Sequence, residues 1–407
     1  MVTAMRTLIA VLVGLLLPTL TDAADKAKPV DFEVKNTLTF ERGQTLVSHS
    51  IDLTGKARLL GPDGKELACS YDSKQKKLLF LDTFKAAETK KYQVVNEEPK
   101  VKPPKWTTKM LKDELELKMG KRTVKCQGGS IDNGLLRLRV FRNDELRAEV
   151  EVTALKGGYK FRCNPLGSAV GCIDDKKYAA EIDDVIAKGG DSHPQLMNVY
   201  CGVPEKVEFV EINAFQRLIK VACTPFAVKS NKEMPEVLSE SSMNITLTWG
   251  SPVVEIKSHR KVATVFYNHN GVYLNEFYLS QFPIDLSVDG EAEAKHVEAG
   301  NITNGALNTN CTRFLLLKYG DAKASYQTVI YVPDFEKCGI EGPRFSAFKD
   351  RMMTVISQSW HQGWKPIEIK AQDYDDRVVL VCDIASSLKP EGKKYGDWVE
   401  EVEKPAQ

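Results

Sequence analysis

Apolar and polar residues alternate along most of the chain, as they do in β-strands that bury one face and expose the other. The alternation falls in short segments separated by turn residues; examples between residues 122 and 385 are GLLRLRVF, ELRAEVEVTAL, KVEFVEI, NITLTW, KVATVFY and RVVLVCDI. So many strands predict sheets packed face to face, because each sheet must cover its apolar face. No repeat with a period of about 20–50 residues is present, which disfavours propellers and solenoids.

Two segments have helical character. The segment WTTKMLKDELELKM (106–119) fits an amphipathic helix, but the alternation in ELELKM also fits a strand, so both interpretations stay open. The segment KKYAAEIDDVIAKGG (176–190) predicts a helix that ends at its paired glycines. Helices are therefore expected to be few.

Composition divides the chain into units. Short strand-like runs such as KLLFL and KKYQVV, with turns such as GPDG between them, predict a compact N-terminal β-domain over 29–96. The charged, proline-rich stretch 97–105 predicts a linker, and the charged tail 391–407 is expected to be loose. The predicted fold class is all-β, with a small N-terminal β-unit followed by a large antiparallel β-supersandwich with few helices over 106–390.

The N-terminus predicts export. Arg6 gives a positive start, Leu8–Leu17 is an apolar run, and Thr21-Asp22-Ala23 is a small-residue cleavage site, so residues 1–23 fit a signal peptide. The run is short for a membrane span, although an uncleaved N-terminal anchor is the alternative. The mature chain is thus expected to be secreted or periplasmic, without a membrane span.

Charge gives no sign of a nucleic-acid partner. Lysine and arginine number 56 against 55 aspartates and glutamates, which leaves a formal net charge of +1. A chain this close to neutral has no global attraction to polyanions, although a local basic groove remains possible.

The nine cysteines allow up to four disulfides in an exported protein. Cys163 and Cys172 bracket the short loop CNPLGSAVGC and are the easiest pair to join, while Cys201 and Cys223 flank a strand-rich stretch. Cys382 lies in RVVLVCDIA, which favours a buried free thiol. No CxxC or clustered Cys/His spacing predicts a zinc site.

Several segments resemble known carbohydrate-active families. The N-terminal DFEVKNTLTFERGQTLVSHSIDL resembles the leading β-domain of secreted bacterial carbohydrate-active proteins. The segments GGSIDNGLLRLRVF, VEFVEINAFQRLIKVAC and NITLTWGSPVVEIKSHRKV resemble the β-supersandwich of galactose-mutarotase-like proteins and supersandwich polysaccharide lyases, nearest to the rhamnogalacturonan exo-lyase type. The resemblance covers about two-thirds of the chain and rests on pattern rather than on a catalytic signature.

The chain also departs from those lyases, which commonly add a helical toroid as one wall of the substrate groove. This sequence has no room for such a toroid. Either the groove is built wholly on the sheet surface and its loops, or the protein is a binding or degenerate relative.

The stretch VFYNHNGVYLNEFYL (265–279) is the first candidate site. Its Asn270-Gly271 pair predicts a type I′ turn and therefore a hairpin. Both faces of such a hairpin mix aromatic and polar side chains, a mixture that suits sugar binding: rings stack on a pyranose while asparagine and histidine bond its hydroxyls. A solvated hairpin tip is the alternative.

A polysaccharide lyase needs a base for the proton next to a uronate carboxylate and a group that neutralises that carboxylate. The predicted catalytic residues are His269, Tyr273, Tyr267 and Arg260. The predicted ligand-binding residues of the same region are Asn268, Asn275 and His259.

The loop-like stretch SQSWHQGWKP (357–366) is the second candidate site. Trp360, His361 and Trp364 would form a sugar platform, or the two tryptophans simply pack under a loop. Other chemistry lacks support, since GxSxG, HExxH and glycine-rich phosphate motifs are absent. No cofactor is expected, although calcium held by scattered carbonyls stays possible. Asn244, Asn301 and Asn310 begin N-glycosylation sequons, which matter only in a eukaryotic source.

These observations predict a secreted carbohydrate-active protein that cleaves an acidic polysaccharide by β-elimination. The alternative is a non-catalytic carbohydrate-binding or envelope protein on the same scaffold. The expected partner is a polysaccharide or oligosaccharide.

Overall fold

A computed structural model describes most of the chain, and nearly every element in it is a β-strand. The described residues are 28–112, 115–119, 122–173, 197–229, 232–233, 238–268, 272–278, 285–288, 295–296, 307–309, 314–320, 325–333, 343–348, 353–358, 367–383, 400–401, 403–404 and 406. A helical turn with Glu400, Glu401 and Glu403 accompanies the strands. This architecture confirms the predicted all-β class.

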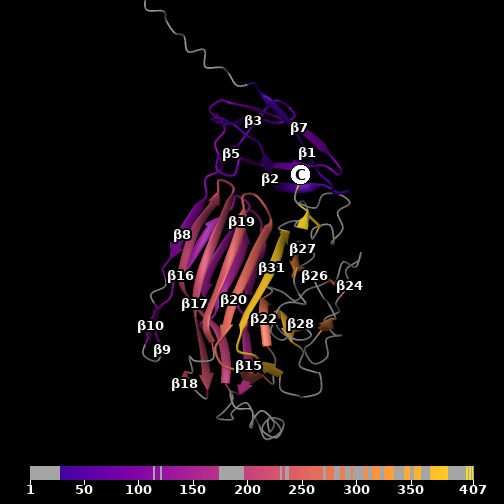
Figure 1. The fold of residues 1–407 in the computed structure, drawn as a ribbon. Helices are drawn as coiled ribbons and strands as arrows, with labels where there is room; N and C mark the ends of the chain where they lie inside the picture. Colours follow the sequence, from indigo (N-terminus) through magenta and orange to yellow (C-terminus); the bar gives the residue numbers. More distant parts are fainter. Residues whose placement is uncertain are drawn as a thin grey trace, which may run out of the picture.

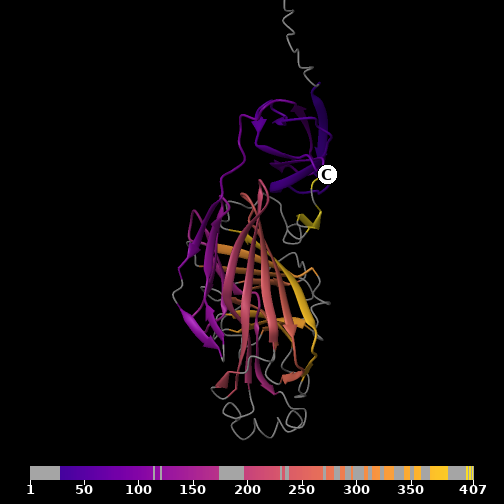
Figure 2. The same ribbon diagram turned by 60° about the vertical axis from the view of Figure 1, so that its left-hand side comes forward.

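The N-terminal unit consists of two small antiparallel sheets above the ends of the long strands, in indigo in Figures 1 and 2. One sheet has the order β1 (Val30–Lys35), β7 (Thr89–Val95), β3 (Arg58–Leu60), β4 (Glu66–Leu67). The other has the order β2 (Arg42–Ser50), β6 (Lys77–Phe84), β5 (Cys69–Asp72). We refer to these seven strands as the N-terminal unit.

Alternation builds the core of the N-terminal unit. In β1, Phe32 and Val34 are buried while their neighbours are exposed, so one face of the strand points inward. The rings of Phe32 and Tyr92 stack 5.4 Å apart, and Phe80 lies 4.9 Å from Tyr92. An aromatic cluster of this kind gives a small unit a large share of its buried apolar area.

The large sheet system contains two rows of antiparallel strands. The first row runs β8 (Thr107–Leu111), β11 (Gly128–Asp132), β12 (Leu136–Arg142), β13 (Ala148–Ala154), β14 (Lys160–Asn164), β22 (Val272–Tyr278), β29 (Met353–Gln358), β28 (Pro343–Phe348), β25 (Leu307–Thr309). The second row runs β16 (Met197–Asn213), β17 (Gln216–Lys229), β19 (Leu238–Thr248), β20 (Val253–Val262), β31 (Asp373–Asp383), β27 (Ser325–Tyr331), β26 (Phe314–Gly320), β23 (Asp285–Val288).

The strand β15 (Ser168–Ile173) joins the two rows, because it pairs with β16 in one and with β22 in the other. Four short strands also belong to this system: β18 (Lys232–Glu233), β21 (Phe266–Asn268), β24 (Lys295–His296) and β30 (Ile367–Ile369). The strands β9 (Glu116–Met119) and β10 (Arg122–Lys125) lie outside it. One hydrophobic core holds side chains of both rows, such as Val150 and Phe161 from the first and Ile245 and Ile256 from the second. The rows therefore pack face to face, as the alternation predicts.

The structure decides between the two interpretations of 106–119. The described residues of this segment, 106–112 and 115–119, form two strands, β8 and β9, and no helix. β9 pairs with β10 in a separate two-stranded sheet, so the alternation in ELELKM was the informative pattern. The helix predicted over 176–190 lies outside the described residues.

The hairpin predicted at Asn270-Gly271 is wrong. β21 and β22 do not pair with each other; both pair with β15, through Tyr267↔Ile173 on one side of the gap and Tyr273↔Ser168 on the other. The register between them shifts by a single residue, so the two strands follow β15 in the same direction. Long-range pairing has overridden a local turn signal.

The disulfide between Cys163 and Cys172 is also wrong, because Cys163 is a free, buried cysteine. Cys201 and Cys223 are free and buried as well, and burial raises the pKa of the Cys201 thiol to about 11. Cys382 is fully buried and forms no disulfide, as its prediction expected.

The C-terminal tail differs from the loose segment expected. Three of its described residues, Glu401, Lys404 and Ala406, contact the N-terminal unit, and Figures 1 and 2 both show the C-terminus beside that unit. The predicted boundaries of the signal peptide, the linker and the two domains stay predictions.

Candidate functional site

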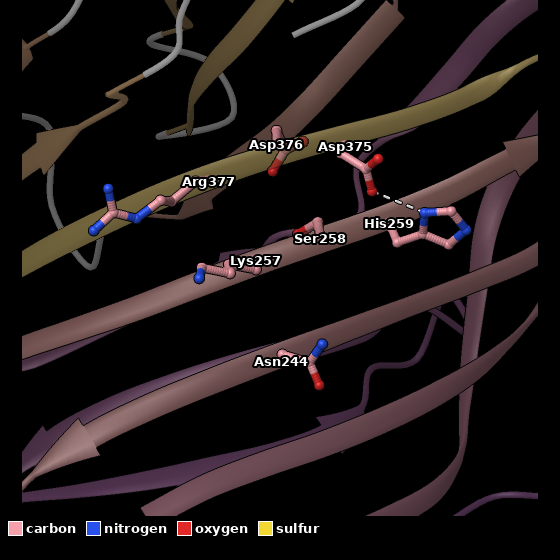
Figure 3. Close-up of a pocket in the computed structure, with 7 residues that line it drawn as sticks. All are labelled: Asn244, Lys257, Ser258, His259, Asp375, Asp376 and Arg377. Atoms are coloured by element: carbon pink, nitrogen blue, oxygen red, sulfur yellow. Dashed lines mark hydrogen bonds and ion pairs between the residues drawn. The ribbon is translucent and has the colours of Figure 1, made fainter. Parts of the chain in front are cut away.

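A hollow of about 610 Å³ lies on the solvent-facing side of β19, β20 and β31. We call it the β20–β31 groove, and Figure 3 shows the residues that line it: Asn244, Lys257, Ser258, His259, Asp375, Asp376 and Arg377. Strand register brings them together, since Lys257 lies opposite both Asn244 and Arg377. His259 lies opposite Asp375 in the same way.

His259 and Asp375 form an ion pair or hydrogen bond across the two strands. The Nδ1 atom of His259 lies 2.8 Å from Oδ1 of Asp375, and the side chains point toward each other in Figure 3. A carboxylate accepts only, so Nδ1 carries the hydrogen when His259 is neutral and Nε2 keeps its lone pair. The pair thus presents a histidine nitrogen able to take a proton.

Two cations lie beside this pair. The Nε atom of Arg377 donates to Glu255 at 2.6 Å, and the ammonium of Lys257 lies 3.7 Å from the same carboxylate oxygen. The Lys257 side chain is 63% exposed, so its charge is available to an anion that enters the groove. Because Nε of Arg377 donates to Glu255, the orientation of the planar guanidinium group is fixed.

The opposite face of the same strands carries a buried ion pair. Arg260 and Asp376 alternate with His259 and Asp375, and they are 5% and 9% exposed, so Asp376 borders the groove but its side chain is buried. Their side chains form an ion pair, and Nη1 of Arg260 also donates to the carbonyl of Leu166 at 3.0 Å. Burial raises the pKa of Asp376 above its ordinary value, and the charge of Arg260 opposes that shift.

The loop 164–168 connects this buried pair to a second buried carboxylate. Ser258 donates to the carbonyl of Pro165 at 2.9 Å from one side. From the other side Asn164 and Ser168 donate to Glu276, at 3.0 and 2.9 Å. The loop is therefore fixed from both rows of strands, which makes this polar cluster a structural support beneath the groove.

Glu276 has a further cationic partner in Arg147, whose Nη1 lies 2.9 and 3.1 Å from the two carboxylate oxygens. The neighbouring Asn275 is also buried, and its side-chain amide makes no hydrogen bond of ordinary geometry in the described part of the chain. Adjacent residues of a strand point to opposite faces, so both faces of β22 are covered here. The solvated hairpin face that the sequence suggested does not exist at these positions.

The predicted site residues are therefore dispersed. His259 lies in the groove, Arg260 and Asn275 are buried behind it, and Tyr267 on β21 is half-buried. The backbones of Asn268 and Tyr273 pair with β15. His269, Trp360, His361 and Trp364 lie outside the described residues.

Sequence reasoning missed the partners of His259. Asp375 is 116 positions further along the chain, so only strand pairing brings the two together. One signal was present: in DYDDR (373–377) the alternation places Asp375 and Arg377 on one face of a strand that leads into RVVLVCDI. Asn244 was noted only as the start of a sequon.

Metal ligation finds no support in the described part of the chain, where no three histidine, cysteine or carboxylate side chains gather. No helix in that part has the length and apolarity needed to cross a membrane. Calcium bound through scattered carbonyls stays an expectation.

No protein family and no curated protein matches this sequence. The chain is similar in fold to an alpha-mannosidase from Enterococcus faecalis V583, with 10% identity and a TM-score of 0.45 over 88% of this chain and 43% of that one. It is similar also to a protein in the glycosyl hydrolase family 38 from Enterococcus faecalis, with 10% identity and a TM-score of 0.46 over 88% and 44%. The chain thus spans less than half the length of these two structures.

Proposed function

We propose that this chain is an exported carbohydrate-active protein that binds an acidic polysaccharide in the β20–β31 groove and cleaves it by β-elimination. The observation that supports the proposal is the His259–Asp375 pair, at 2.8 Å, beside the cations of Lys257 and Arg377. A histidine base and a carboxylate neutraliser are the two groups that this reaction requires. Export rests on the signal-like residues 1–23.

In this reaction Nε2 of His259 takes the proton from the carbon next to the uronate carboxylate. The electron pair of that C–H bond forms a carbon–carbon double bond, and the glycosidic oxygen on the neighbouring carbon leaves with its bonding pair and takes a proton from water. Asp375 stabilises the imidazolium that forms. Lys257 and Arg377 neutralise the carboxylate, which makes the adjacent proton easier to remove.

A binding-only role is the second candidate, and one observation favours it. The Asp375 side chain is 72% exposed, so the pair faces bulk water, where electrostatic stabilisation of developing charge is weak. The same cations would still attract an anionic sugar chain. This candidate keeps the groove and its ligand but omits the chemical step.

The test uses the full chain with polygalacturonate and other uronic-acid polysaccharides. Elimination creates a conjugated double bond, so we expect ultraviolet absorbance to rise with time. His259→Gln should reduce the rate by about 10²–10⁴-fold, whereas Lys261→Gln, an exposed position on the same strand outside the groove lining, should leave it unchanged.

Binding is measured separately, by retardation of the protein in gels that contain the polysaccharide. Retardation that depends on Lys257 without any rise in absorbance would favour the binding-only role. Absence of both retardation and absorbance with every uronic-acid polymer would overturn the proposal for this groove.

A further inference from the structure

The N-terminal unit contains one fully buried cation, Arg42, which is 2% exposed on β2. Within its own unit, Nε of Arg42 donates to Oδ1 of Asn36 at 2.9 Å. The remaining partners come from the far end of the chain: Nη1 donates to the carbonyl of Glu401 at 3.1 Å, and Nη2 donates to the carbonyl of Lys404. A buried guanidinium without acceptors is costly, so the unit depends on carbonyls that it does not itself contain.

The segment that supplies these carbonyls ends a helical turn, where free carbonyl groups attract a cation. Glu400, Glu401 and Glu403 lie in a helical turn, closed by the bond from the amide of Lys404 to the carbonyl of Glu400 at 2.9 Å. The last carbonyls of a helical segment have no partner within it, and they attract positive charge. Arg42 supplies both the donors and the charge.

Two further contacts place the segment on the N-terminal unit. The backbone amide of Gly43 donates to Oε1 of Glu401 at 3.0 Å. Ala406 is 6% exposed and belongs to the hydrophobic core of the unit, among Phe32, Val34 and their neighbours. The segment therefore satisfies a backbone donor, a buried cation and part of an apolar core at once.

The same segment also contacts the large sheet system. The hydroxyl of Tyr331, which is 3% exposed at the end of β27, donates to Oε1 of Glu403. Residues 400–406 thus bond to the N-terminal unit on one side and to β27 on the other.

We infer that Arg42, Asn36 and Gly43 form a docking socket for the segment 400–406, which joins the N-terminal unit to the large sheet system as a noncovalent clasp. The ligand class is a peptide that ends a helical turn, offering two backbone carbonyls to a guanidinium and one carboxylate to a backbone amide. The clasp is a second connection beside the covalent one at 97–105. It is independent of the groove and of the function proposed for it.

The test cuts the covalent connection and asks whether the clasp holds. A recognition site for a specific protease is inserted in the linker 97–105 of the full chain, the protein is cleaved, and the fragments are separated by size exclusion at low micromolar concentration. We expect the fragments to elute together. Fragments that separate in the otherwise unaltered protein would overturn the inference.

Variants in the tail isolate the clasp from other contacts, such as the approach of Gln44 to Gly250. Ala406→Arg places a charged side chain in the core of the N-terminal unit, and it should release the cut fragment. Lys404→Ala is the matched control, because Arg42 bonds the backbone carbonyl of this residue, and fragments should stay together.

Since the tail variants leave the sequence of the N-terminal unit intact, its folding is checked directly by the circular dichroism of the released fragment. An excess of a synthetic peptide of residues 400–407 should also displace the tail and release the fragment. Persistent co-elution of the cut Ala406→Arg protein, with no release by the peptide, would show that the clasp does not hold the unit.

Discussion

Two ion pairs lie one residue apart on β20 and β31, and they have opposite surroundings. His259 and Asp375 face water, with side chains 30% and 72% exposed. Arg260 and Asp376 face the interior, with side chains 6% and 2% exposed. The two pairs differ in surroundings because successive side chains of a pleated strand point to opposite faces of the sheet.

The difference shows how one short charged stretch serves two purposes. An exposed pair contributes little to stability, because water competes for both charges, yet its atoms remain accessible to a ligand. A buried pair is inaccessible, but removing one partner leaves a charge without solvation. The pair facing inward therefore supports the sheet, and the pair facing outward is available for chemistry.

Removal of Arg260 should have the largest effect. We expect Arg260→Met to lower the free energy of unfolding by about 3–5 kcal/mol, because the carboxylate of Asp376 stays buried without its cation. Urea denaturation of Arg260→Met and of Arg377→Met measures this, the second variant being a control on the exposed face. Equal losses for the two variants would contradict the distinction between the faces.

A neutral substitution at Glu276 should have an intermediate effect. Glu276→Gln keeps the shape but loses the charge that accepts from Arg147, Asn164 and Ser168. We expect a loss of roughly 1.5–3 kcal/mol, the range for hydrogen bonds to charged groups. The same denaturation experiment gives the value, with Glu240→Gln at an exposed position as the reference. If Glu276→Gln lowers the free energy of unfolding by less than Glu240→Gln does, the polar cluster around the loop 164–168 does not stabilise the fold.

Removal of the exposed histidine should have the smallest effect on stability. His259→Gln should change the free energy of unfolding by less than about 0.5 kcal/mol, as surface substitutions usually do. Thermal melting checks this beside the activity assay. A marked drop in melting temperature would assign His259 a structural role instead.

The fold was predictable from sequence where the cause is local. Alternation in β12 and β20 reflects one buried face, and it correctly indicated strands packed in two layers. Where paired strands are far apart in the sequence, the same reasoning failed. Asn270-Gly271 carries a turn preference, but β21 and β22 both pair with β15, a strand about a hundred residues earlier.

In the candidate site, too, features that depend on local sequence were predicted and contacts between distant strands were missed. His259 was found because of its residue type, while its partner Asp375 was missed because register, and not spacing along the chain, brings them together. Arg260 was placed beside His259 in a single site, although adjacent strand residues point to opposite faces. Cys163 was paired with Cys172 on loop length alone, and the structure places it as a free thiol in the core between the rows.

The position of β31 has a consequence for the order of folding. This strand is the last one in the described part of the chain, yet it pairs with β20 on one edge and with β27 on the other, in the middle of the second row. Until residues 373–383 have left the ribosome, both partners present unpaired backbone edges, which are the surfaces that pair wrongly between chains. We expect ribosome-bound chains that end before residue 373 to be protease-sensitive and prone to association, and chains in which residues 373–383 have left the exit tunnel to gain protection in a single step.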